Sequence, residues 1–286
     1  MEAQKYLQKI KKEFPKLTWR NYQYINHGYD HVVIILDRKI IFRFPKSNEY
    51  IKILKDEIIL LNYLKTKIKT NIPQYYLLAK DCSFAGYHLL PGKELTVNRF
   101  KKLKSIKKIN IANKLAIFLT ELHTRKNISL KKFKIKKEDG PKYFKTLLED
   151  AKKYVFPNLT KPEQESFNMY FANLHKILFI KRPSVLIHND LSDDHILLNK
   201  TNLSIIDFSD RSIGDPARDF AWLWMYGDSF IKQVYEMYRG KKDKTFLSRS
   251  KIYLKIIPLQ VMIAAKKGKV CKYKDGYDLF KKVINL

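Results

Sequence analysis

The chain has 286 residues, enough for one large domain or two lobes around a buried core, and its formal net charge at pH 7 is +29. No apolar run approaches the ~20 residues that a membrane-spanning helix needs. The best candidate, residues 252–265, is interrupted by Lys255, Pro258 and Gln260. The first fourteen residues are polar and amphipathic, unlike a signal peptide. We therefore expect a cytoplasmic protein with no membrane partner, and its two cysteines are too few for a disulfide framework.

The positive charge is a weak indicator of a nucleic-acid partner. The 57 lysines and arginines outnumber 28 aspartates and glutamates, a balance typical of proteins that bind nucleic acid or an anionic surface. Only ten of the 57 are arginine, however, and isoleucine, asparagine, tyrosine and phenylalanine are abundant too. These residues share AT-rich codons with lysine. Genome composition therefore explains the lysine excess at least as well as a polyanionic partner does, and we expect no nucleic-acid partner.

The first ninety residues combine helical and strand patterns. A helix is predicted over residues 1–14, ending before Pro15. Apolar residues recur at helical spacing in a second segment, residues 49–65. Runs of apolar, β-branched and aromatic residues, separated by turn residues, predict five strands. These runs are residues 22–28, 30–36, 39–45, 75–81 and 84–90.

After residue 92 the pattern becomes largely helical. Thr160 and Glu163 have the spacing of a capping box, with a proline in the first turn. Residues 185–208 are the exception, because they form short strands or loops around an acidic cluster. The sequence thus predicts an α+β fold with two lobes: a small antiparallel sheet lobe over residues 1–90, and a larger, mainly helical lobe over residues 91–286.

Acidic residues are concentrated in one segment of this basic chain. Residues 188–219 contain seven aspartates against three cations, which gives this segment a net charge of −4 and leaves +33 for the rest. The local field should favour cations. The seven are Asp190, Asp193, Asp194, Asp207, Asp210, Asp215 and Asp219.

The spacing within this segment carries a resemblance. His188-x-Asp190-x-x-x-x-His195, followed twelve residues later by Asp207-Phe208, resembles the H-x-D-x-x-x-x-N and D-F-G elements of the kinase fold. The stretch "HNDLSDDHILL…LSIIDFSDRSIGDPARDFA" is more similar to the aminoglycoside phosphotransferases, in particular the 2''-phosphotransferases, in which histidine replaces the asparagine. The resemblance covers nearly the whole chain in architecture, but its specific motifs lie in residues 188–221.

This resemblance implies a two-lobed, protein-kinase-like fold and transfer of the γ-phosphoryl group of ATP or GTP to an aminoglycoside hydroxyl, hence antibiotic resistance. Asp190 would orient the attacking hydroxyl and accept its proton, and Asp207 would hold Mg²⁺ against the triphosphate. The resemblance also implies that His195 is a metal ligand or lies next to one. Mg²⁺ prefers oxygen ligands, so chemistry alone leaves that role open. We expect His188 to hold the loop by hydrogen bonding.

The remaining acids have a structural and a functional interpretation. Asp215, before Pro216, is expected to cap a helix, and Asp219 to anchor the loop from within the fold. The others are either solvated or positioned to contact the ammonium groups of a polyamine sugar. The candidate substrate contacts are Asp194, Asp210 and Glu236.

A kinase-like sheet lobe also needs a cation on its third strand, paired with a glutamate of the next helix. In "KIIFRFPK" that cation is Arg43, with Lys46 as the alternative. Glu57 borders the apolar face of the predicted helix, and we expect it to pair with Arg43. The first turn has one glycine, Gly28, where protein kinases have G-x-G-x-x-G, so the phosphates must be covered differently.

The segment "GYHLLPGKEL" resembles the hinge between kinase lobes. Backbone groups between Leu89 and Gly92, including Leu90, would hydrogen-bond the purine, and Tyr87 would shape its pocket. The alternative is that residues 87–92 are only a strand and a turn.

The preferred interpretation is a monomeric, Mg²⁺-dependent aminoglycoside kinase. A kinase of a macrolide, choline or another small alcohol would share the same core residues. A basic nucleic-acid-binding protein on an inactive kinase scaffold is the alternative from another class, and its affinity would fall steeply with salt.

Overall fold

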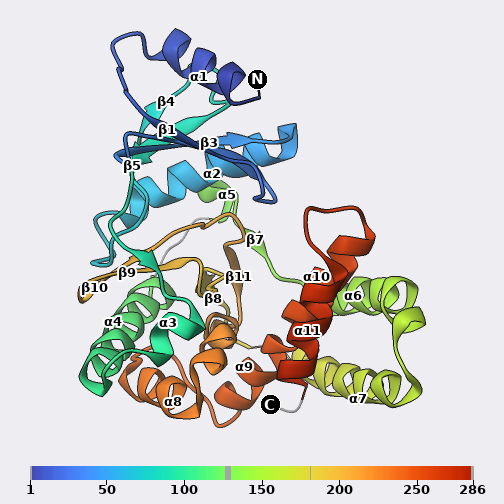
Figure 1. Cartoon of the computed structure of the whole chain (residues 1–286). Helices are drawn as coiled ribbons and strands as arrows, with labels where there is room; N and C mark the ends of the chain where they lie inside the picture. The colour runs from blue at the N-terminus through green and yellow to red at the C-terminus, as the bar shows by residue number, and fades with distance from the viewer. Residues whose placement is uncertain (1, 126–129, 181, 285–286) are drawn as a thin grey trace.

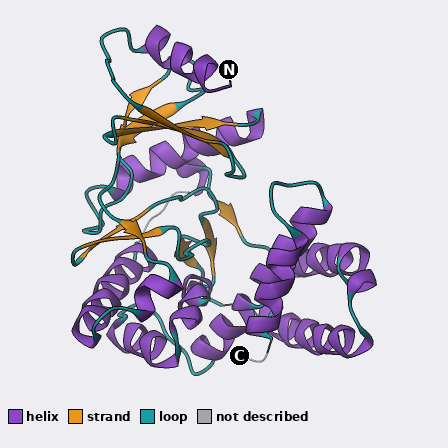
Figure 2. Ribbon diagram, in the orientation of Figure 1, coloured by secondary structure: helices purple, strands orange, loops and turns teal. Residues whose placement is uncertain are grey.

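The computed structural model describes residues 2–125, 130–180 and 182–284. An antiparallel sheet with a helix on each face forms the upper lobe in Figure 1, and helices with two small sheets form the larger lower lobe. Figure 2 shows the strands gathered in the upper lobe and at the junction between the lobes. This confirms the predicted α+β, two-lobed fold. Within the described ranges, no helix has the length and apolar character that crossing a bilayer requires.

The N-terminal lobe is built on a five-stranded sheet with the order β1-β2-β3-β5-β4, in which every neighbouring pair is antiparallel. All seven predicted elements of this region are present. They are α1 (Glu2–Glu13), β1 (Tyr22–Ile25), β2 (His31–Leu36), β3 (Ile40–Pro45), α2 (Asn48–Leu64), β4 (Tyr75–Leu78) and β5 (Ala85–His88).

Strand β3 shows how the sequence pattern sets the two faces of the sheet. Phe42 and Phe44 are buried in one apolar cluster with Leu7 and Ile10 of α1. Arg43 lies between them and projects to the opposite face, toward α2, because successive side chains of a strand alternate. A single strand therefore packs the lobe on one face and presents a cation on the other.

The C-terminal lobe contains most of the helices, with short strands close to the acidic segment. Its small sheets have the orders β10-β9-β6 and β7-β11-β8. The elements, with η for a 3-10 helix, are β6 (Lys93–Glu94), α3 (Val97–Lys101), α4 (Ser105–His123), α5 (Leu130–Phe133), β7 (Lys136–Lys137), α6 (Gly140–Tyr154), η1 (Phe156–Asn158), α7 (Lys161–Leu178), β8 (Val185–Ile187), β9 (Ile196–Asn199), β10 (Asn202–Ile205), β11 (Ser212–Gly214), η2 (Pro216–Phe220), η3 (Trp222–Tyr226), α8 (Asp228–Met237), α9 (Phe246–Leu254), α10 (Ile256–Lys266) and α11 (Tyr273–Val283).

Two helix starts follow the predicted capping chemistry. The backbone N–H of Thr160 donates to the Glu163 carboxylate (2.8 Å), as in a capping box. The Asp215 carboxylate accepts from the N–H of Ala217 (3.0 Å). The segment after Asp215 is not the single helix that we expected, however, but the two short 3-10 helices η2 and η3. Most of its side chains are buried, so tertiary packing rather than one amphipathic face decides its backbone.

The crossing between the lobes is a close contact between two backbones. Gly92 has φ +127°, and a Cβ there would lie 3.0 Å from the carbonyl carbon of Leu198 in β9. Just before it, the Pro91 carbonyl accepts from the Ser204 hydroxyl (3.3 Å). The crossing is thus fixed against β9 and β10, and the lobe division at residues 90 and 91 stays a prediction.

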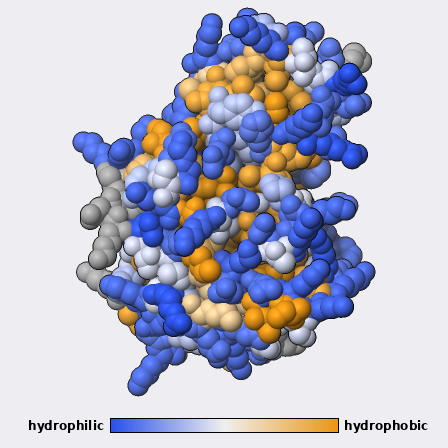
Figure 3. Space-filling view, turned by 90° about the vertical axis from the view of Figure 1, so that its left-hand side faces the viewer, coloured by the Kyte–Doolittle hydropathy of each residue, from blue (hydrophilic) through white to orange (hydrophobic). Residues whose placement is uncertain are grey.

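One face of the molecule mixes hydrophilic and apolar surface. On the face shown in Figure 3, hydrophilic side chains spread over both lobes, and apolar patches lie over the upper lobe and, between hydrophilic side chains, over the lower lobe as well. This distribution fits lysines that are solvated individually.

Gly92→Ala should destabilise the protein more than Gly268→Ala. Both glycines have a positive φ, but a Cβ at Gly268 meets nothing within 4 Å. We expect the free energy of unfolding to fall by about 3 kcal/mol for Gly92→Ala and by about 1 kcal/mol for Gly268→Ala, measured by urea unfolding. Equal losses would show that the contact with Leu198 is not restrictive.

Candidate active site

The loop between β8 and β9 is held from below by a buried carboxylate. Asp219 accepts the backbone N–H groups of His188 (2.8 Å) and Asn189 (2.7 Å). It also contacts His123 Nε2 (2.9 Å), and His123 Nδ1 contacts the Tyr238 hydroxyl (2.8 Å). Burial alone would raise the pKa of Asp219, but the hydrogen bond from His123 helps to hold it below its usual value. The predicted anchoring role of Asp219 is confirmed.

Two positions in this region have a left-handed backbone. Asn189 has φ +69° and Asp207 has φ +62°. Asparagine and aspartate tolerate this conformation better than most residues, because their short side chains bond local backbone groups. The turn at Asn189 immediately precedes Asp190, and the turn at Asp207 follows β10. The side chains of Asp190 and Asp207 therefore both project from sharp turns of the backbone.

His188 supports the loop from inside. Its Nε2 donates to the Ile206 carbonyl (3.0 Å), and its Nδ1 accepts the backbone N–H of Asp190 (3.3 Å). Burial lowers the pKa of the imidazole from 6.5 to about 4, although Asp219 opposes the shift. His188 is therefore neutral at pH 7 and holds the loop by hydrogen bonding, as predicted.

His195 brings the two principal carboxylates together. Its Nδ1 donates to the Asp190 carbonyl (2.8 Å) and lies 3.3 Å from the Asp190 carboxylate. Its Nε2 lies 3.8 Å from Asp207 Oδ2. Asp190 and Asp207 thus lie on either side of a single imidazole. We refer to the region around these three side chains as the cleft.

The charges in this cleft shift one another's protonation. Burial raises the pKa of Asp190 to about 6. Burial opposes protonation of His195, but Asp190 and Asp207 outweigh it and raise the pKa of His195 to about 9. Asp207 stays ionised, because Arg43 and His195 overcome its desolvation and hold its pKa well below the usual range.

Arg43 connects the sheet lobe to this cleft. Its NH1 donates to Glu57 (2.9 Å), which shows that the predicted pair forms. Its NH2 donates to Asp207 (3.1 Å) and to the Ser209 hydroxyl (3.1 Å). Only 5% of Arg43 is exposed, so this guanidinium is a buried link between β3, α2 and the segment after β10.

The other predicted nucleotide-side residues have varied positions. Lys46 donates to the carbonyls of Asn26 (2.9 Å) and Gly28 (2.6 Å), and so holds the glycine turn between β1 and β2. Tyr87 is a buried residue of β5, and Leu90, after that strand, is partly buried against the core. Their contacts with a nucleotide stay predictions.

The predicted acceptor contacts divide into two sets. Asp194 lies 3.8 Å from His195 Nε2 and is largely exposed. Asp210 lies near Asp190. Desolvation and the charge of the Asp190 carboxylate together raise the pKa of Asp210 to about 7. Glu236 is exposed on α8, which packs against α4 and η3, and it lines neither cavity beside Asp190. The structure brings Asp194 and Asp210 to the cleft but not Glu236.

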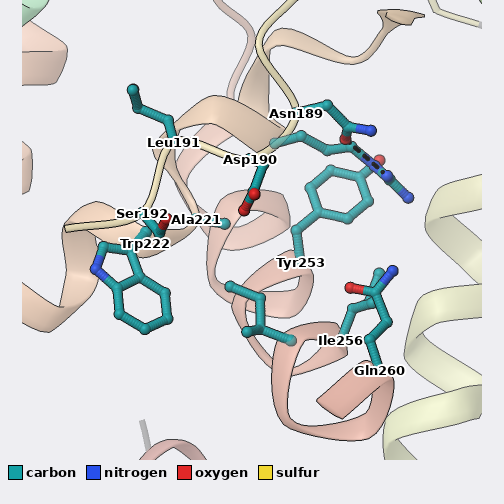
Figure 4. A pocket seen from close by; sticks show the side chains of 11 residues that line it. Asn189, Asp190, Leu191, Ser192, Ala221, Trp222, Tyr253, Ile256 and Gln260 are labelled. Carbon is teal, nitrogen blue, oxygen red and sulfur yellow. Dashed lines mark hydrogen bonds between the residues drawn. The ribbon is translucent and has the colours of Figure 1, made fainter. Parts of the chain in front are cut away.

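Two cavities lie beside the loop that carries Asp190, and Asn189 lines both. Figure 4 shows the smaller, about 110 Å³, with the Asp190 carboxylate directed into it between Trp222 and Tyr253. The larger, about 530 Å³, extends from Asn189 and Asp210 toward α6. Its charges nearly balance, since four acids face five cations. These are Asp56, Glu138, Asp139 and Asp210, with Lys134, Lys136, Lys137, Arg211 and Arg218.

The donor set around Asp207 is compatible with Mg²⁺ bound through phosphates. Among the residues that the structure describes, no group of three or more His, Cys, Asp or Glu is arranged to hold a metal. Mg²⁺ usually binds proteins through one or two carboxylates and completes its shell with waters and substrate phosphates. Asp207 Oδ1 is occupied by Arg43 and Ser209, which leaves Oδ2, on the side of His195, as the oxygen for an ion.

Sequence patterns did not indicate three of the residues that organise this site. Tyr75 shares Arg43 NH1 (3.0 Å), Ser209 shares NH2, and Arg218 binds Asn189 (3.0 Å). The position of Ser209 two residues after Asp207 was an available signal. Tyr75 and Arg218 come from remote segments with no local signature.

The stability of the protein should fall in acid because of His188. The unfolded chain binds a proton near pH 6.5 and the folded chain near pH 4, so unfolding takes up protons in this window. We expect a loss on the order of 3 kcal/mol as the pH falls from 6.5 to 4. His188→Gln keeps a donor for Ile206 but does not titrate. Urea unfolding at several pH values should give it a shallower slope, and parallel curves would refute this assignment.

Comparison with known proteins places the chain in a family. The model described as the phosphotransferase enzyme family matches residues 21–245, well over half of the chain. A structure of APH(2'')-IIIa with GDP and kanamycin has a TM-score of 0.87 at 26% identity, covering 98% of each chain. The GDP complex of wild-type aminoglycoside 2'-phosphotransferase-IIIa has a TM-score of 0.88 at 25% identity, covering 100% of this chain and 99% of that one.

A macrolide 2'-phosphotransferase from Brachybacterium faecium is similar in fold alone, with a TM-score of 0.68 at 16% identity over 93% of this chain and 92% of that one. The aminoglycoside enzymes therefore resemble the chain more closely over nearly the same length. With its two-lobed kinase-like fold and a family match that includes Arg43, Asp190 and Asp207, the chain belongs to the phosphotransferase enzyme family.

Proposed function

We propose that the chain transfers the γ-phosphoryl group of ATP or GTP to a hydroxyl of an aminoglycoside, with Mg²⁺ as cofactor. The observation that carries this proposal is the placement of Asp190 and Asp207 on either side of His195, with Arg43 behind Asp207. The 2''-hydroxyl is the proposed acceptor position, supported by the similarity to APH(2'')-IIIa, whose structure contains GDP and kanamycin. Such an enzyme would act in the cytoplasm as a monomer and confer resistance.

The protonation states suit this reaction. Phosphoryl transfer has a loose, highly charged transition state, so catalysis depends on positioning and electrostatic stabilisation. With a pKa of about 6, Asp190 is mostly ionised at pH 7 and able to orient a hydroxyl and accept its proton. Asp207, which stays ionised, would hold Mg²⁺; the ion when bound would neutralise charge on the phosphates. His195, whose pKa is raised to about 9, would have to lose its proton to border the metal as a ligand. Its Nδ1 bond to Asp190 keeps Nε2 directed at Asp207.

The nucleotide would lie between the glycine turn and the segment before Gly92. Arg43 is cationic at any physiological pH and faces the cleft beside Asp207, so it is the proposed contact for the phosphates. Glu57 fixes its direction. Lys46 would act on the phosphates indirectly, because its ammonium group already holds the Gly28 turn. Tyr87, Leu90 and Gly92 would border the purine.

The acceptor would enter from the side of the two cavities. Its ammonium groups would find acids at Asp194 and Asp210, next to the reacting carboxylate. Because five cations also line the larger cavity, its acids would attract a polyamine less strongly than the carboxylates around Asp190.

Two other functions use the same fold. Leu191, Trp222 and Ile256 give the smaller cavity apolar walls, which would also suit a macrolide or another small alcohol such as choline. A nucleic-acid-binding protein on an inactive scaffold would need no paired carboxylates. It would bind DNA or RNA with an affinity that falls steeply as salt increases.

Asp190→Asn should abolish aminoglycoside-dependent turnover. The purified protein is mixed with Mg²⁺, ATP or GTP, and kanamycin, gentamicin, a macrolide or choline, and nucleoside diphosphate release is measured. The variant keeps the shape of Asp190 but cannot accept a proton, so we expect kcat to fall by about 10²- to 10⁴-fold. Asp278→Asn, on an exposed face of α11, is the control. Turnover stimulated only by the macrolide or choline would reassign the acceptor, and turnover independent of any acceptor would indicate hydrolysis.

Arg43 can be tested with a charge-neutral double variant. Arg43→Met alone leaves Glu57 buried without its partner and should cost about 3–5 kcal/mol of stability. Arg43→Met with Glu57→Gln removes both charges and should recover much of this loss. The nucleotide KM should stay raised, by roughly tenfold or more, in both proteins if Arg43 contacts the phosphates. A double variant with the original nucleotide KM would show that Arg43 is only structural.

A further inference from the structure

Arg218 occupies an unusual position beside the loop that carries Asp190. Its guanidinium lies between the rings of Tyr143 (4.8 Å to the centroid) and Tyr253 (5.0 Å). NH1 contacts the Glu138 carboxylate (3.1 Å) and donates to Asn189 Oδ1 (3.0 Å), the bond drawn dashed in Figure 4. The side chain is 13% exposed, so a largely buried cation contacts two rings, a carboxylate and an amide.

These partners belong to different parts of the C-terminal lobe. Glu138 lies just before α6 and Tyr143 lies on it, whereas Tyr253 comes from α9. Asn189 is in the loop between β8 and β9. Figure 1 shows α6 with α7 on the side of the lobe opposite α4 and α8. Arg218 therefore connects α6 directly to the residue before Asp190.

Asn189 needs this support because its conformation is unfavourable by itself. Its backbone is left-handed, and three groups hold it: Asp219 at the N–H (2.7 Å), the Asp210 carbonyl at Nδ2 (3.1 Å) and Arg218 at Oδ1. The side chain of Asp190 is nearly half exposed, and its direction depends on the turn that precedes it.

We propose that Arg218 is a positioning residue that sets the direction of Asp190 through Asn189 and ties it to α6. Arg218 lines both cavities beside this loop, the smaller with Asp190 and the larger with Asn189. An acceptor in either cavity therefore packs against the group that aligns the carboxylate, and acceptor binding and alignment of the base are coupled. The inference rests on the proposed function for its acceptor chemistry, but the link from Arg218 to the loop does not depend on the acceptor.

The test is a double-mutant cycle on kcat. Arg218→Met keeps the bulk but loses the charge and the hydrogen bond, and Asn189→Gly removes the side-chain acceptor while allowing a positive φ. We expect each single variant to lower the kcat of kanamycin phosphorylation by roughly 10- to 100-fold with little change in nucleotide KM. The double variant should be no worse than Asn189→Gly, because Arg218 acts through that side chain. Arg218→Lys should restore part of the rate, since an ammonium group can still reach between the rings.

Lys267→Met is the matched control. Lys267 also pairs with an acid of α6, Asp150 (2.7 Å), and lies over the Tyr154 ring (5.5 Å), but it does not touch the loop. If general docking of α6 is what matters, this variant should lower kcat as much as Arg218→Met. Multiplicative losses in the double variant, or an unchanged kcat in Arg218→Met, would overturn the proposal. If Arg218→Met does not fold, Arg218→Lys in both backgrounds gives the same comparison with a smaller expected loss.

Hydrogen exchange separates this inference from the proposed function. In Arg218→Met the amides of residues 188–192 should exchange roughly tenfold faster than in the original protein, and in Lys267→Met they should not. This measurement needs no substrate. Faster exchange without kanamycin turnover in the original protein would keep the role of Arg218 and reject the acceptor. Unchanged exchange would reject the role of Arg218 whatever the acceptor is.

Discussion

The arrangement of the cleft depends on the buried guanidinium of Arg43. It bonds Glu57 within the sheet lobe and Asp207 within the helical lobe, so each carboxylate is compensated by the same cation. Removing Arg43 or one of its carboxylate partners would leave a buried charge without an opposite charge. The free-energy cost of that change is larger than the net stabilisation that the intact ion pairs provide. The ion pairs of Arg43 with Glu57 and Asp207 thus link the two lobes and keep Asp207 ionised. Without Arg43, desolvation would raise the pKa of Asp207 and favour its protonated form.

The acidic segment of this basic chain contains aspartates with different tasks, which burial and partners separate. Asp219 is buried and Asp215 nearly so. Asp219 accepts hydrogen bonds from backbone N–H groups and contacts His123, and Asp215 accepts from the Ala217 N–H and from Arg249. The Asp190 side chain faces His195, and neighbouring carboxylates surround Asp190 and Asp210, so desolvation and these like charges raise their pKa values to about 6 and about 7. The same side chain is an ionised anchor where donors surround it, and its pKa lies near neutrality where they are few. Counting aspartates could not reveal this division, because the donors come from other segments.

Local chemistry could be predicted from the sequence, and long-range contacts could not. The resemblance to the kinase fold, together with the alternation of Phe42, Arg43 and Phe44 and the position of Glu57, predicted the ion pair that forms. The capping residues Thr160 and Asp215 were also evident, since a cap is a contact within a few residues. By contrast, the bond between His123 and Asp219 joins residues 96 positions apart. The two 3-10 helices after Asp215 and the position of Glu236 away from Asp190 depend on how the helices pack, which no local period specifies.

The two cations that organise the cleft, Arg43 and Arg218, also explain how this chain uses its basic residues. Its 47 lysines set the net charge, yet within the described part of the chain no lysine is buried. The buried positions belong to arginine, including Arg211 and Arg249. A guanidinium is planar, less strongly hydrated than an ammonium group and able to serve several acceptors at once. Arg43 reaches from β3 of the sheet lobe to Asp207, and Arg218 reaches from η2 to Asn189. The net charge describes the solvated surface, and the few buried arginines hold the carboxylates and backbone turns of the interior.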